Sequence, residues 1–155
     1  MEIPITPERK KFGEITFFGS NKELEDFLET TDKVKIIERM DTGFSEMCYW
    51  FVFGKAKWFK RMNEREKEAF ITNADALLGS KGYHKIEIPK NGDIAVYSFS
   101  SNEDGWVAHY GEYCNGKVRS KFGRTHIYEH DIGFVPSDFG DTVKFFRKSG
   151  RGEGE

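Results

Sequence analysis

The chain has 155 residues, a length that suits one folded domain with a buried core. Its formal net charge is −2, from 24 basic and 26 acidic side chains, so composition gives no reason to expect a nucleic-acid or anionic-membrane partner. The 15 phenylalanines argue against disorder over most of the length.

The two cysteines, Cys48 and Cys114, are typical of free thiols rather than of a disulfide framework. The residues after Met1 do not resemble an apolar leader, and no run of the sequence has the apolar length of a membrane span. We therefore expect a cytoplasmic protein in a reducing compartment, with no membrane partner.

The first half of the chain is predicted to be mainly helical. Two prolines suggest an extended arm over residues 1–12, and a short strand is expected at 15–18. Ser20 and Glu23 have the spacing of a capping box, which predicts a helix near 21–30. Further expected elements are a strand or extended link at 34–37, a helix over the apolar run 45–54 with Ser45 as its N-cap, and a helix from the Asn63 cap to Gly79.

The second half is predicted to form an antiparallel sheet around residues 92–123. Residues 94–99 are rich in β-branched and aromatic side chains, and Asn115-Gly116 is a strong hairpin signal. The other expected strands are an edge strand at 83–88, the strand that carries His109, the return through 118–123, and two strands at 127–130 and 142–147. The pattern predicts one α+β domain over residues 1–148, with a disordered tail at 149–155.

Cys48 and His109 are the residues that suggest chemistry. A cysteine in the first turn of a helix has a lowered thiol pKa, and a neighbouring imidazole completes its activation as a nucleophile. On its predicted strand, His109 shares one face with Val107, Gly111 and Tyr113, and the opposite face carries Trp106, Ala108 and Tyr110.

Several short motifs follow one another in a definite order. They are C-Y-W-F-V-F-G at 48–54, G-D-I-A-V-Y at 92–97, His109, S-K-F-G at 120–123, His130 and F-G at 139–140. This order and spacing, over roughly residues 44–147, resembles the papain-like cysteine peptidases of the NlpC type, and in particular a largely uncharacterised branch of them.

The resemblance implies a papain-like α+β fold and a thiol hydrolase or acyltransferase that acts on an amide bond of a protein or peptide-like substrate, without a cofactor. Cys48 would be the nucleophile and His109 the general base. His130 would orient the imidazole, with Ser120 and His126 as lesser candidates for that role.

The same resemblance leaves room for an inactive relative. Met47 stands where the family pattern has asparagine, and Trp50 and Phe51 are bulkier than the usual residues. The alternative function is therefore a catalytically inactive papain-like fold that serves as a protein- or ligand-binding module.

Two further sites are weaker hypotheses. His126 and His130 are four residues apart, and Cys48, His84 and Cys114 could add metal ligands, but the region has neither a helical pattern nor a C-x-x-C motif. We expect no metal. The basic stretch 55–61, with its interleaved aromatics, could contact phosphates, although a solvated face over core aromatics is the preferred interpretation.

Overall fold

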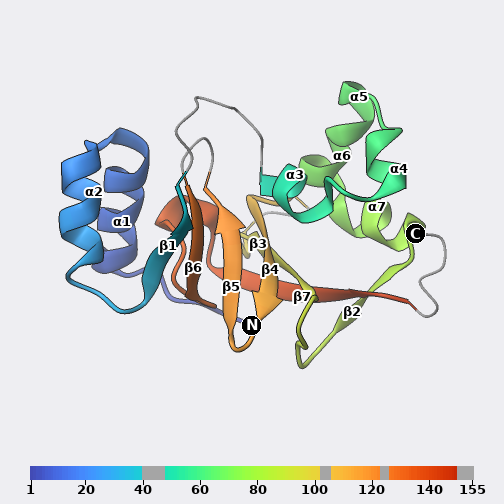
Figure 1. Ribbon diagram of the computed structural model, residues 1–155. Helices are drawn as coiled ribbons and strands as arrows, with labels where there is room; N and C mark the ends of the chain where they lie inside the picture. The colour runs from blue at the N-terminus through green and yellow to red at the C-terminus, as the bar shows by residue number, and fades with distance from the viewer. Residues whose placement is uncertain (40–47, 102–105, 123–125, 150–155) are drawn as a thin grey trace.

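A seven-stranded antiparallel sheet forms the centre of the molecule in the computed structural model, which describes residues 1–39, 48–101, 106–122 and 126–149. The strand order is β1-β6-β5-β4-β3-β7-β2 (Figure 1). The strands are β1 (Val34–Glu38), β2 (Tyr83–Ile86), β3 (Ile94–Ser98), β4 (His109–Cys114), β5 (Lys117–Lys121), β6 (Ile127–Asp131) and β7 (Thr142–Lys148). The expected α+β class and antiparallel sheet are confirmed.

Two groups of helices flank the sheet at opposite ends (Figure 1). The blue pair, α1 (Pro7–Phe18) and α2 (Asn21–Leu28), lies beside β1. The green group lies at the other end and comprises α3 (Cys48–Phe53), α4 (Lys57–Lys60), α5 (Glu64–Lys67), α6 (Ala69–Thr72) and α7 (Ala74–Ser80). A short 3-10 helix, η1 (Ser137–Phe139), precedes β7.

The sheet separates two hydrophobic clusters, because successive side chains of a strand point to opposite faces. On β3, Ala95 and Tyr97 belong to the first cluster, whereas Ile94 and Val96 belong to the second. The first cluster is built around Phe12 and packs under α1 and α2; the second contains the aromatic side chains of the green helices.

The expected arm at 1–12 and strand at 15–18 are wrong, because residues 7–18 form α1. Thr6 caps this helix by accepting a hydrogen bond from the Arg9 N–H, and Pro7 occupies the first turn, where a missing N–H has no cost. Phe12 is fully buried, which gives α1 its tertiary stabilisation.

Arg9 fixes α1 to the rest of the domain. It is 2% exposed and donates to the carbonyl oxygens of Val135 at 2.7 Å, Pro4 at 2.8 Å and Gly140 at 2.6 Å. Burial lowers the pKa of Arg9, but its charge is retained because the ordinary value is so high. A buried guanidinium needs such acceptors, so this network explains why α1 docks in one place.

The predicted helix from Asn63 to Gly79 is wrong as a continuous element. The Asn63 capping box is present, but the segment divides into α5, α6 and α7, with a break at Asn73. The carbonyls of Phe70 and Ile71 accept hydrogen bonds from the Tyr110 hydroxyl and the Val107 N–H. These carbonyls are therefore taken by β4 and the segment just before it rather than by a following helical turn.

Other local predictions are confirmed. Ser20 and Glu23 form the expected capping box of α2. Asn115 and Gly116 both have positive φ in the β4–β5 hairpin, as a two-residue turn requires. The predicted helix around Cys48 exists from Cys48 to Phe53, whereas its proposed cap Ser45, the turn at 102–105 and most of the tail lie outside the described residues. Among the described residues, no helix has the length and apolar character needed to cross a membrane.

Candidate functional site

The structure brings His109, His130 and Ser120 together on the face of the sheet that the first cluster covers. All three are buried, and the rings of both histidines pack against Tyr97 and Phe122. The Ser120 hydroxyl lies 2.8 Å from His130 Nε2, and His130 Nδ1 lies 2.8 Å from the Asp131 carbonyl oxygen. Because a carbonyl can only accept, Nδ1 carries the proton and Nε2 accepts from Ser120.

His109 has a different environment from His130. Its ring stacks flat on Phe139, with ring centres 4.3 Å apart, and within the described part of the chain neither ring nitrogen has a hydrogen-bond partner. Burial lowers the pKa of His109 well below its ordinary value, and the nearby His130 lowers it further. The imidazole is therefore neutral at physiological pH and packs as an aromatic ring.

Cys48 lies at the start of α3 and packs with the second cluster. Burial raises the pKa of its thiol to about 11, and backbone hydrogen bonds, the first of them with Tyr110, offset only part of that shift. The positive charge of Lys121 also lowers the pKa of this thiol, but less than burial raises it. A thiol of this pKa is ionised in roughly one molecule in ten thousand at neutral pH.

The proposed nucleophile and base therefore belong to different clusters. The Cys48 thiol contacts the backbone of Tyr110, whose side chain points into the second cluster, whereas the ring of the preceding residue, His109, points into the first. Of the residues singled out in the sequence, His109, His130 and Ser120 come together, and Cys48 does not join them. The dyad itself stays a prediction.

The two weaker hypotheses concern a metal site and a phosphate contact by the basic stretch 55–61. Among the described residues, no three histidine, cysteine or acidic side chains converge in a way that could hold a metal ion. In the basic stretch 55–61, Phe59 is fully buried and Trp58 packs on Phe53 and Phe70, with the Lys81 ammonium over its ring. These aromatics belong to the core, and the exposed lysines of the stretch lie above it.

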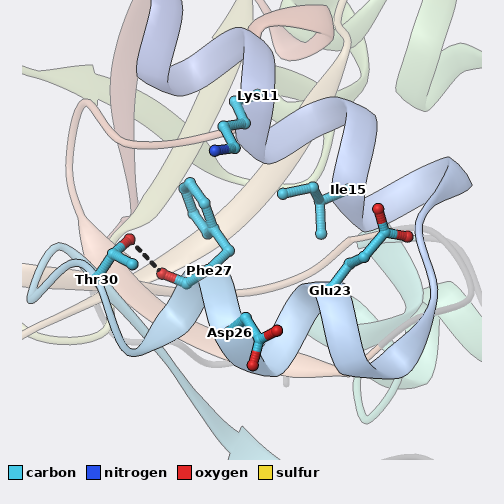
Figure 2. Close-up of a pocket in the computed structure, with 6 residues that line it drawn as sticks. All are labelled: Lys11, Ile15, Glu23, Asp26, Phe27 and Thr30. Carbon is cyan, nitrogen blue, oxygen red and sulfur yellow. Dashed lines mark hydrogen bonds between the residues drawn. The ribbon is translucent and has the colours of Figure 1, made fainter.

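A crevice lies between α1 and α2 (Figure 2). Lys11 and Phe27 project into the space between the two helices, and Thr30 donates to the Phe27 carbonyl. The acidic residues at its rim are already engaged, because Asp26 pairs with Lys22 and Glu23 closes the capping box. This crevice is therefore a gap between two packed helices.

A second hollow lies beside residues 2–5 and is lined by Asp141, whose carboxylate accepts two hydrogen bonds from Ser100.

The third hollow lies between the end of β2, the first half of β7 and the start of the chain, and we call it the β2–β7 groove. Its apolar lining comprises Met1, Ile86, Pro89, Ile132, Val143 and Phe145. Lys85, Glu87 and Lys144 also line it. Ile88, between Glu87 and Pro89, is 81% exposed.

Sequence reasoning did not find this groove. The sequence predicts only an edge strand at 83–88, followed by Pro89. The pattern that could have indicated a binding surface is the alternation of apolar and charged residues over 86–88. Arg9 was also missed, because nothing in a sequence marks a buried arginine whose partners are backbone carbonyls.

Comparison with known proteins identifies no relative of this chain. No family model, no curated protein and no solved structure matches the chain.

Proposed function

We propose that this protein is a non-catalytic binding domain that holds a segment of a protein or peptide in the β2–β7 groove. The observation that carries this proposal is a hollow on the sheet with six apolar and three charged lining residues, next to which the chain exposes Ile88. A hollow that combines an apolar lining with a few charged groups can bury an apolar side chain of a partner and fix its orientation.

The environments of Cys48 and His109 support a non-catalytic role. A thiol nucleophile works as a thiolate, so it needs a lowered pKa and a base in contact with it. Here burial raises the pKa of Cys48 to about 11, and the His109 ring stacks on Phe139 with its nitrogens unbonded. Both features favour structural roles for the two residues.

The size of the groove favours a macromolecular ligand over a small molecule. Its volume is about 240 Å³. Pockets that enclose small-molecule ligands usually measure about 300–1,000 Å³ and surround most of the ligand. A hollow of this size accommodates one or two side chains of a larger partner.

A random peptide library displayed on phage provides the test. We expect selected peptides to bind the native protein and to bind the Ile88→Ser variant at least about tenfold more weakly, because their apolar anchor loses its contact. Phe18→Ser is the matched control, since Phe18 is 87% exposed on α1, which contributes no residue to the groove. Failure to select any peptide whose binding depends on Ile88 would contradict the proposal.

A thiol hydrolase or acyltransferase of papain-like, NlpC type is the second candidate. It is favoured by one observation: Cys48 is the first residue of α3, and α3 packs against β4, the strand that carries His109. In this candidate Cys48 attacks an amide, His109 acts as the base and His130 orients it. Both cysteines are free thiols, which supports our proposal of a reducing, cytoplasmic location for either candidate.

A further inference from the structure

We infer that the ligand of the β2–β7 groove is an extended acidic segment of a protein, anchored by one apolar side chain. This inference rests on the proposed function of the same groove and adds the chemistry of the partner. It follows from the charge of the two strands, from the position of β2 in the sheet and from the exposed Ile88.

The chain is nearly neutral overall, but the two strands that form the groove are strongly basic. β2 and β7 contain Lys85, Lys144, Arg147 and Lys148 and no acidic residue. Arg147 is neutralised by Asp93, with which it makes hydrogen bonds of 2.9 and 2.7 Å, and the Lys148 ammonium lies over the Tyr83 ring. Lys85 and Lys144 line the groove with the single acidic residue Glu87, and this positive balance favours an acidic partner over a basic one.

The position of β2 favours an extended ligand. This strand pairs with β7 on one side and is the last strand in the order of the sheet. An edge strand presents backbone groups that an extended segment can bind, while a neighbouring hollow selects its side chains. Ile86 packs against the first cluster and Ile88 lies beyond it, so an apolar anchor of the ligand has a surface to bury.

Fluorescence anisotropy with two labelled peptides tests the inference. One peptide has a leucine flanked by glutamates and aspartates, and in the other lysines replace all of the acidic residues. We expect the acidic peptide to bind at least about tenfold more tightly, and its affinity to fall as salt rises. Glu87→Lys should strengthen its binding.

Charge reversal on the protein supplies the second arm of the experiment. Lys85→Glu combined with Lys144→Glu should weaken binding of the acidic peptide by about tenfold, because two exposed charge pairs become repulsive. Lys10→Glu is the matched control, since Lys10 is an exposed lysine on α1, which contributes no residue to the groove, and it should leave the affinity unchanged.

The outcomes separate this inference from the proposed function. Equal binding of the two peptides, with a loss on Ile88→Ser, would overturn the acidic preference and leave the groove as a binding site. Binding of neither peptide in a manner sensitive to Ile88→Ser would overturn both. Two other results would also overturn the inference. One is a single-stranded oligonucleotide that binds with the same dependence on Lys85 and Lys144 but without dependence on Ile88. The other is a dimer of the protein that dissociates in the Ile88→Ser variant.

Discussion

Acidification is expected to destabilise this domain, because two buried imidazoles must stay neutral in the folded state. His109 and His130 lie together in the first cluster, and burial lowers the pKa of both. The pKa of His130 falls from the usual 6.5 to about 4. The unfolded chain takes up these protons near the usual pKa, whereas the folded protein does so only at lower pH.

The sign and size of the effect follow from this difference. Above about pH 6.5 both states leave His130 neutral, so stability does not depend on it; as pH falls towards about 4, unfolding binds a proton and stability is lost. Between about pH 7.5 and pH 5, His130 alone should cost about 2 kcal/mol. His109 acts in the same direction. Burial acts to raise the pKa of the Asp93 carboxyl, but the hydrogen bonds from Arg147 and the Lys90 N–H lower it overall. Protonation of this carboxyl therefore reduces the stability of the folded protein in a more acidic range.

Urea denaturation at these two pH values measures the effect. His109→Phe should reduce the pH dependence and keep the fold at neutral pH, because the substitution keeps the stack on Phe139 and removes two nitrogens that have no hydrogen-bond partner among the described residues. His84→Gln is the matched control, since His84 is an exposed histidine on β2. An unfolding free energy that is the same at both pH values would refute the reasoning.

Two further predictions concern the parts of the fold that fix α1 and β7. Arg9→Met should destabilise the protein by about 3 kcal/mol or more in urea, because several buried carbonyls lose their donor; Lys10→Met, at an exposed neighbour, should have little effect. Gly140→Ala should cost about 2 kcal/mol or more in the same assay, since Gly140 has φ of 116° and a Cβ there would lie 2.1 Å from the Ser98 carbonyl oxygen. Gly79→Ala, with open space around its Cβ position, should be neutral or stabilising. Comparable losses at Gly79 and Gly140 would contradict this account of Gly140.

The sheet was predictable from the sequence because its signals are local. Alternating apolar residues, β-branched side chains and the Asn115-Gly116 turn act within a few residues of one another. The helix α1 was not predictable in this way. Its prolines suggested an extended arm, and its stability depends on Arg9 and Phe12, whose partners lie far along the chain.

The candidate site illustrates a similar limit. Strand alternation correctly placed His109 and Tyr110 on opposite faces, but it was wrong for Val107, which precedes β4 and packs in the cluster of Tyr110. Alternation also does not say which face α3 covers. That choice depends on how the apolar residues of the helix pack, and here they join the cluster of Tyr110. A sequence resemblance that links Cys48 to His109 therefore leaves their spatial relation open.

The alkylation rate of Cys48 in the native protein tests most directly whether this chain is a binding domain or a thiol enzyme. Iodoacetamide is added across a range of pH, and mass spectrometry compares modification of Cys48 with that of Cys114, both of which are half-buried. With the pKa of Cys48 raised to about 11, we expect no advantage for Cys48 below about pH 8 and no change in the His109→Phe variant. Rapid modification of Cys48 below about pH 8 that is lost in His109→Phe would contradict a non-catalytic role and establish the dyad.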